Sequence, residues 1–372
     1  MNDSPQPDQI TGAPHPRAAR LLGHQGAQAA FLEAFNSARL HHAWMITGPR
    51  GVGKATLAWK IARFLLATPE GDGGMFAPAA PINLDISDDH PVAKRLLALS
   101  EPRLFLLRRP YDDKAERLKN DITVDEVRRM KSFFALSAAD GGRRVAIVDS
   151  LDEMNASAAN ALLKLLEEPP DRVTFLLIAH QPARLLPTIR SRCRELRLAP
   201  LNAQELADAL TAAGGEVDSQ QRLALGELAG GSVGRAFELT NLDGLHLYQA
   251  LVDLLGGLPR LDRPRATALA EMAAGKGAEA QFDLIIQLID LFLARCARAA
   301  ALGGLAEDAA PGEGLVIARL AAPARAALAW AELAQVLGQK ARRGRAVNLD
   351  PAALVLDMLL GIEMATREMT RG

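Results

Sequence analysis

Cysteine is scarce in this chain, which has only Cys193 and Cys296 among its 372 residues. Two cysteines exclude a disulfide framework and a four-cysteine zinc module built within the chain. A low cysteine content is typical of proteins from a reducing compartment, so we expect a cytoplasmic protein without zinc.

Excess charge and long apolar runs are missing as well. The formal net charge is −1, from 43 basic and 44 acidic residues. No global charge therefore draws the chain to nucleic acid, and any DNA contact must come from a local patch. The most apolar stretch, 284–296, contains Gln287, Asp290 and Arg295. It is too short to span a bilayer and predicts a buried helix, not a membrane segment.

The sequence does contain most of a phosphate-binding loop. Residues 48–55 fit the pattern G-x-x-x-x-G-K-[ST] at every position but the last. In this motif, glycines turn backbone N–H groups toward phosphate oxygens and the lysine, here Lys54, reaches the outer phosphates. An apolar strand at 43–46 precedes the loop, and a helical pattern follows it. A chance glycine turn is the alternative, but this strand and helix favour the phosphate loop.

The groups that complete a hydrolytic site are absent from their expected places. Ala55 stands where a Ser or Thr hydroxyl would bind Mg²⁺, and Thr56 comes one position late. Asp149 ends an apolar strand where an aspartate would hold the Mg²⁺ shell. Ser150 follows it, in place of a hydrolytic glutamate, and cannot act as a general base without a base of its own.

Asp152 and Glu153 are close by but at the wrong offset, and a solvated loop or a helix start is the better interpretation. Nucleotide binding without hydrolysis stays open, and Mg²⁺ is expected only together with a nucleotide. The residues expected to line such a site are Gly48, Arg50, Gly51, Gly53, Lys54, Ala55, Thr56 and Asp149.

The order of the predicted elements indicates an α/β domain followed by helices. Strands that are apolar on both faces, at 103–107, 145–148 and 173–179, alternate with helices, which predicts a parallel sheet covered on both sides. After Pro200 no convincing strand is found. We predict a disordered tail at 1–20, an α/β domain at 21–199, a small helical domain at 200–244 and a C-terminal helical domain at 245–372.

Two further segments have weaker interpretations. The strongest basic cluster lies with two glycines in a predicted inter-helix loop, and it comprises Lys340, Arg342, Arg343 and Arg345. It could contact DNA phosphates, but a plain solvated loop is at least as good an interpretation, since no aromatic residues are interleaved. Residues 68–91, rich in Gly, Pro and Asp, predict a long surface loop. His90 within it has no other His or Cys at ligand spacing, so we assign no metal site.

Three strings of residues resemble one family. They are 40–44 (Leu-His-His-Ala-Trp), 160–170 (Asn-Ala-Leu-Leu-Lys-Leu-Leu-Glu-Glu-Pro-Pro) and 186–193, which ends in Ser-Arg-Cys. Together they resemble the AAA+ clamp-loader subunits of bacterial DNA polymerase III. The resemblance covers about residues 20–240 closely and the C-terminal helices loosely. It implies an AAA+ domain, a helical lid domain and a helical collar domain.

Within that family, the sequence departs from the ATP-hydrolysing motor subunits. The motors carry Thr where this chain has Ala55, an acidic pair where it has Ser150, and usually a zinc module where 68–91 lacks cysteine. At the sensor-1 place, Ala-His-Gln (179–181) replaces a threonine-containing segment, and Gly234 falls at the sensor-2 arginine. The resemblance therefore implies a non-hydrolysing subunit with a degenerate nucleotide site.

The resemblance also implies a role for Arg192, which alone would be interpreted as a surface arginine. It would be an arginine finger, offered in trans to ATP on a neighbouring motor subunit. The implied partners are gamma/tau motors and a delta subunit in a hetero-pentamer, the sliding clamp and primer–template DNA. Two rival hypotheses are an active ATPase motor of the same ring and a P-loop kinase, although kinases lack the Ser-Arg-Cys motif and the collar-like tail.

Overall fold

The computed structural model describes residues 13–37, 39–69, 79–112, 114, 117–135, 142–212, 214, 219–275, 278–305, 307–322 and 326–369. Parts of the predicted tail (1–12) and of the predicted loop (70–78) lie outside these residues. Contacts group the chain into two compact units: Met1–Gly215 with Ser232–Gly234, and Glu216–Gly231 with Arg235–Gly372. The predicted boundaries near 199 and 244 stay a prediction, because a contact grouping does not delimit functional domains.

A five-stranded sheet forms the centre of the first unit, in the order β2-β5-β6-β1-β7. All four pairings in it are parallel, which confirms the predicted sheet. Its strands are β1 (Ala43–Thr47), β2 (Leu104–Arg108), β5 (Arg144–Asp149), β6 (Val173–Ala179) and β7 (Arg194–Arg197). A separate two-stranded ribbon pairs β3 (Tyr111–Asp112) with β4 (Arg117–Leu118).

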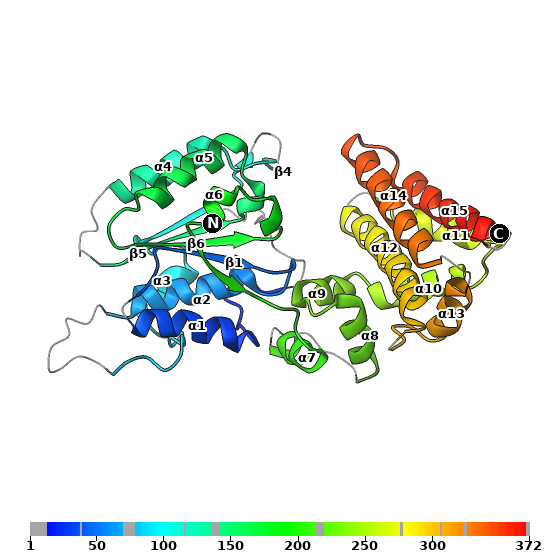
Figure 1. Cartoon of the computed structure of the whole chain (residues 1–372), viewed down its shortest axis with the longest axis horizontal. Coiled ribbons are helices and arrows are strands. Elements are labelled where there is room, and N and C mark those ends of the chain that lie inside the picture. Colours follow the sequence, from blue (N-terminus) through cyan, green and yellow to red (C-terminus); the bar gives the residue numbers. More distant parts are fainter. Residues whose placement is uncertain are drawn as a thin grey trace. The chain divides into compact units, whose positions relative to one another are not determined.

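Helices cover both faces of this sheet, as Figure 1 shows. One face carries α1 (Gln25–Asn36), α2 (Lys54–Ala67) and α3 (Pro91–Leu97), and the other carries α4 (Val124–Ala135) and α5 (Ala156–Glu167). Short turns η1 (Leu151–Glu153), η2 (Pro182–Arg184) and α6 (Pro187–Arg190) join the strands, and α7 (Ala203–Ala212) follows β7. Because both faces are covered, β6 is buried along its whole length.

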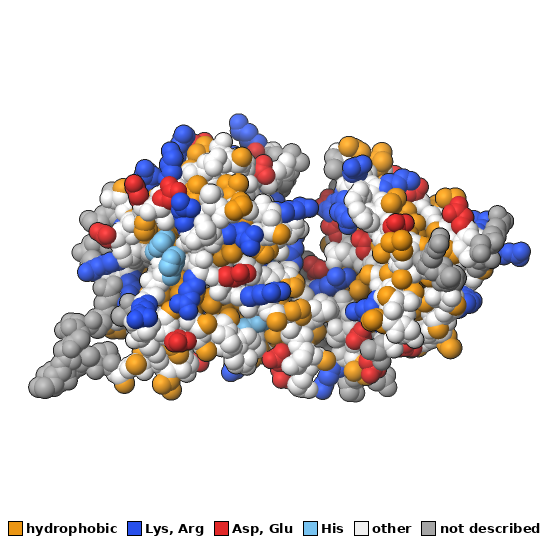
Figure 2. All heavy atoms as spheres, viewed as in Figure 1, with side chains coloured by type: hydrophobic (Ala, Val, Ile, Leu, Met, Phe, Trp, Pro, Cys, Tyr) orange, Lys and Arg blue, Asp and Glu red, His pale blue; other side chains and the backbone are white. Residues whose placement is uncertain are grey.

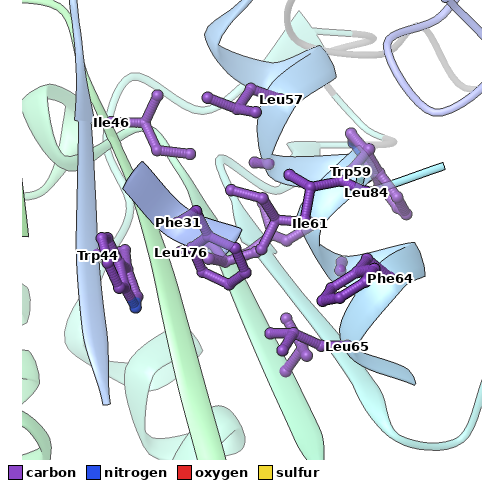
Figure 3. Packing of buried hydrophobic residues seen from close by; sticks show 14 of the residues in the cluster. Phe31, Trp44, Ile46, Leu57, Trp59, Ile61, Phe64, Leu65, Leu84 and Leu176 are labelled. Carbon is purple, nitrogen blue, oxygen red and sulfur yellow. The ribbon is translucent and has the colours of Figure 1, made fainter. Parts of the chain in front are cut away.

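The core on the α1–α2 face holds the phosphate-loop strand and helix together. Trp44 and Ile46 of β1 pack with Leu57 and Ile61 of α2 and with Phe31 of α1, as Figure 3 shows. All five side chains are at most 1% exposed. Both elements that flank the loop at 48–53 are thus fixed by apolar packing, and this packing positions the loop.

Residues 13–20, from the segment predicted to be a disordered tail, are described and lie against α2. The His15 ring meets Trp59 edge to face at 6.2 Å, and Arg63 Nη2 donates to the Arg17 carbonyl oxygen at 3.1 Å. Burial, aided by the nearby charges of Arg17 and Arg108, lowers the pKa of His15 to about 4.

The second unit consists of helices, and no strand occurs among its described residues. They are α8 (Ser219–Ala229), α9 (Val233–Asn241), α10 (Gly244–Leu255), α11 (Arg263–Glu271), α12 (Glu279–Leu302), α13 (Glu313–Ala321), α14 (Ala326–Ala346) and α15 (Pro351–Met369), and α9 starts within Ser232–Gly234. In the described part of the chain, no single helix is long and apolar enough to cross a membrane; only α13 and α14 taken together, across a sharp bend, have that composition.

The basic cluster at 340–345 lies inside α14, so the predicted inter-helix loop is wrong. Its two glycines do not break the helix; they allow close packing. A side chain at Gly344 would meet Leu354 at 2.5 Å, and one at Gly338 would meet Asp290 at 2.9 Å. Three of the four cations pair with carboxylates: Lys340 with Asp357, Arg342 with Asp290 and Arg345 with Asp283. Figure 2 likewise shows basic and acidic side chains interspersed on the face in view.

A buried ion-pair cluster joins four helices of the second unit. The side chain of Arg295 on α12 is 1% exposed and that of Glu313 on α13 is fully buried, with 2.6 Å between Arg295 Nε and Glu313 Oε1. Tyr248 on α10 donates its hydroxyl to Glu313 at 2.6 Å, and Arg295 Nη1 reaches Glu227 on α8 at 2.6 Å. The backbone N–H of Ala309 adds another bond to Glu313. Each buried charge is therefore paired and hydrogen-bonded.

Replacing Glu313 by Ala should destabilise the protein by about 3–5 kcal/mol, because Arg295 would stay buried without its principal partner. Urea unfolding followed by circular dichroism measures this change. Glu227→Ala is the matched control: Glu227 bonds the same arginine, but its side chain is 31% exposed, so we expect a clearly smaller loss. Equal losses of stability for the two variants would contradict the claim that burial makes Glu313 the more important partner of Arg295.

Candidate functional site

The carboxyl edge of the sheet gathers the residues predicted to form a nucleotide site. The phosphate loop starts at Gly48, directly after β1; Asp149 ends β5; and His180 follows β6. Register keeps these ends together, since Ile46 pairs with Ile178 and Val148 pairs with Leu177. Ligands of α/β folds bind at this edge because parallel strands bring their following loops together.

The loop at 48–53 has a conformation that depends on its glycines. Gly48 has φ +144° and Gly51 has φ +72°, and both values are unfavourable for residues with a side chain. A Cβ at Gly48 would meet the Leu198 carbonyl oxygen at 2.5 Å. Lys54 is 3% exposed and its Nζ donates to the carbonyl oxygens of Gly48 at 2.8 Å and Pro49 at 2.5 Å. The ammonium group of Lys54 thus bonds to the backbone of the loop that precedes it.

Residues far away in the sequence hold the tip of this loop. Ser232 Oγ donates to the Arg50 carbonyl oxygen at 2.9 Å, and the Gly234 N–H donates to the Gly51 carbonyl oxygen at 3.0 Å. His24 Nε2 lies 2.8 Å from the Val52 carbonyl oxygen. Sequence reasoning missed both Ser232 and His24, because no local pattern signals a contact between residues this far apart. Gly234, in contrast, is the residue that the resemblance placed at the sensor-2 position, which stays a prediction.

The metal half of the site fits a bound nucleotide poorly. Ala55 offers no oxygen for Mg²⁺ and contributes to the packing of the core. Ser150 is fully buried and its Oγ has no hydrogen-bond partner among the described residues. Asp149 ends β5 as predicted, and Thr56 lies in the first turn of α2. Of these positions, only Asp149 supplies a carboxylate at the place predicted for a metal.

Asp152 and Glu153 lie in the short helical turn η1, as one of the two predicted alternatives had it, and both are partly buried. Asp152 accepts the backbone N–H groups of His180 at 2.5 Å and Gln181 at 2.8 Å. Glu153 lies 3.0 Å from Arg109 Nε and 3.8 Å from Arg50 Nη2. Both carboxylates are thus occupied in holding loops, and neither is offered as a base.

His180 lies beside the positive groups of the site. Burial, together with the charges of Lys54 and Arg50, lowers the pKa of His180 to about 4, against the opposing influence of Asp152. The imidazole is therefore neutral at pH 7. Neither ring nitrogen has a hydrogen-bond partner among the described residues.

Arg192 lies at the opposite edge of the sheet, so the structure does not bring it together with the other predicted site residues. It precedes β7, where Arg194 pairs with Trp44, whereas the phosphate loop follows Thr47, which pairs with Arg197. At about 3.3 Å per residue, this register separates Arg192 from Gly48 by roughly 15–20 Å along the strands. The guanidinium cannot reach its own phosphate loop.

Contacts with its own unit orient the Arg192 side chain. Its Nη2 pairs with Glu167 at 2.8 Å, and its Nη1 donates to the Thr188 carbonyl oxygen at 2.9 Å. Next to it, burial raises the pKa of the Cys193 thiol to about 12, in agreement with the predicted inert packing role. Arg192 is 35% exposed, so part of the guanidinium faces outward.

A family model matches the sheet-containing half of the chain. Residues 23–202 match the family described as DNA polymerase III, delta subunit. A DNA polymerase III subunit delta' of Pseudomonas aeruginosa is 37% identical over 166 residues, which are 45% of each chain. The delta' subunit of Escherichia coli is 33% identical over 60% of this chain and 61% of its own.

Other relatives bear different subunit names. The tau subunit of Escherichia coli is 28% identical over 95% of this chain, but over only 47% of its own length. The chain thus spans about half the length of the curated relatives that it matches. A gamma-subunit-related protein of Thermotoga maritima aligns with a TM-score of 0.36 at 16% identity, covering 90% of this chain and 99% of its own.

Replacing Gly51 by Ala should destabilise the first unit by roughly 1–3 kcal/mol, because the new methyl would clash with Ser232 Oγ and the residue has a positive φ. Gly26→Ala is the control, for which the expected change in stability has the opposite sign. Gly26 lies in α1, and a methyl group there would have no neighbour within 4 Å, so alanine should stabilise by up to about 1 kcal/mol. Thermal unfolding of both variants measures the difference in stability. A Gly51→Ala variant as stable as the wild type would contradict close packing at the loop tip.

Proposed function

We propose that the chain is the delta-prime subunit of a clamp loader, because residues 23–202 match the family described as DNA polymerase III, delta subunit. In this role it helps to load the sliding clamp on primed DNA during replication. It does not hydrolyse ATP itself; it lends Arg192 to ATP on a neighbouring motor subunit.

The observation that carries this proposal is the position of Arg192. The arginine lies at the amino edge of the parallel sheet, whereas the phosphate loop of the same chain lies at the carboxyl edge. A guanidinium at that edge can act only on a nucleotide that another subunit presents. Its partial exposure and its fixed contacts with Glu167 and Thr188 suit this use.

The chemistry of such a finger is electrostatic. Negative charge spreads over the oxygens of a transferring phosphoryl group, and a guanidinium placed nearby stabilises that charge. Arg192 needs no general base in its own subunit to do this. The buried Ser150, the methyl of Ala55 and the occupied carboxylates of Asp152 and Glu153 are therefore compatible with the role.

The phosphate loop of this subunit would then serve for binding alone. Its glycine turns and Lys54 are suited to hold the phosphates of ATP, and Asp149 would be the carboxylate nearest to an accompanying Mg²⁺. Asp152 and Glu153 are engaged with backbone N–H groups and with Arg109, so we expect neither to activate water and bound ATP to remain intact.

The proposed partners follow from the same role. They are gamma/tau motor subunits and a delta subunit in a hetero-pentamer, with the sliding clamp and primer–template DNA as the bodies that it acts on, in the cytoplasm. The helices from α10 onward would form the collar that joins the subunits. Of the basic cluster on α14, Arg343 would be the first candidate for DNA contact, because the other three cations are paired.

Replacing Arg192 by Ala should leave assembly of the complex intact and lower its DNA-stimulated ATP turnover by roughly 10³-fold at the affected site. The complex is reconstituted with motor subunits of the same organism, and steady-state turnover is measured with and without primed DNA. Arg190→Ala is the matched control, because Arg190 is exposed two residues away and makes no ion pair with a described residue. Unchanged turnover in Arg192→Ala would refute the finger.

A further inference from the structure

Ile189 and Cys193 hold the backbone at Arg192. Ile189 of α6 is 1% exposed and lies in the core beneath the turn. The Cys193 thiol contacts the Ile189 carbonyl oxygen at 3.2 Å, and the Arg192 N–H donates to the same oxygen at 3.1 Å. The Cα of Arg192 is thus fixed, and the freedom that remains belongs to its long side chain.

Glu167 belongs to an equally fixed part of the fold. It is the last residue of α5, and the preceding carbonyl oxygen, of Leu166, accepts a hydrogen bond from His42 Nε2 at 3.0 Å. His42 in turn offers its own carbonyl oxygen to the Phe175 N–H of β6 at 2.7 Å. The C-terminal end of α5 is therefore tied to the amino edge of the sheet, close to where β1 and β6 begin.

A carboxylate at this position is unfavourable for the helix alone. The C-terminal end of a helix carries partial negative charge, and Glu168 adds a second carboxylate next to the first. The cation that compensates Glu167 is Arg192, at 2.8 Å. Glu168 makes no ion pair with a described residue, so Glu167 and not its neighbour carries the contact with Arg192.

The Arg192 guanidinium keeps donors in reserve after these contacts. A guanidinium has five N–H donors. One goes to Glu167 and one to the Thr188 carbonyl oxygen, while Ser191 Oγ lies 3.5 Å from Nη1, at the limit of a hydrogen bond. At least two donors, including Nε–H, therefore have no partner among the described residues and can bind phosphate oxygens.

We propose that Glu167 is a positioning residue for Arg192. Its carboxylate and the Thr188 carbonyl oxygen hold two nitrogens of the guanidinium in one orientation, so that the other donors are presented together to a phosphate of the neighbouring subunit. This inference rests on the proposed finger role of Arg192. Its physical basis is preorganisation: a side chain already fixed in the productive rotamer loses less freedom when it binds.

The test compares Glu167→Ala with Glu168→Ala in the reconstituted complex. Glu167→Ala should lower the turnover number of the DNA-stimulated ATPase roughly three- to tenfold and leave KM for ATP within about twofold, since Arg192 acts on the transition state. Glu168→Ala should change neither. Glu167→Gln, whose amide oxygen still accepts from Nη2, should retain more turnover than Glu167→Ala and serves as the test if the alanine variant does not assemble.

A double-mutant cycle separates the two proposals. If Glu167 acts through Arg192, then Glu167→Ala has no further effect in a complex that already carries Arg192→Ala. Equal losses for Glu167→Ala and Glu168→Ala, or a gain in turnover for Glu167→Ala, would overturn the positioning role while leaving the finger intact. No loss for Arg192→Ala itself would refute the finger, and with it both proposals.

Discussion

The direction of the five parallel strands is the constraint on which the proposed function depends. Because β1, β5 and β6 run the same way, the phosphate loop, Asp149 and His180 meet at one edge, and whatever precedes β7 must lie at the other. The order and direction of the strands therefore determine where Arg192 lies, whatever side chain stands at that position. The chain therefore carries its phosphate loop and Arg192 at opposite edges of the sheet.

Both units have a core of buried apolar side chains, and each adds polar contacts to it. In the first, apolar packing of α1 and α2 on the sheet fixes the loop at 48–53, and hydrogen bonds from Ser232 and Gly234 hold its tip. In the second, the buried cluster of Arg295, Glu313 and Tyr248 ties helices together by charge. The contacts of Ser232 and Gly234 thus hold the tip of this loop in one conformation.

Most of the fold could be predicted because its signals are local. Buried parallel strands appear as continuous apolar runs, and the runs at 145–148 and 173–179 became β5 and β6. The loop predicted at 340–345 is wrong because glycine does not always break a helix, and Gly344 lets α14 pack closely against Leu354. The contacts of Ser232 and Glu167 could not be predicted, since they join residues that only the folded chain brings together.

The central claim is that this chain assists an ATPase and is not one itself. Steady-state ATP hydrolysis by the purified chain alone, with wild type and Lys54→Ala side by side, tests it most directly. We expect no turnover above background for either protein, whether or not ATP binds. Turnover that depends on Lys54 would mean that another group replaces the missing base at Ser150, and that the chain is a motor subunit of the ring.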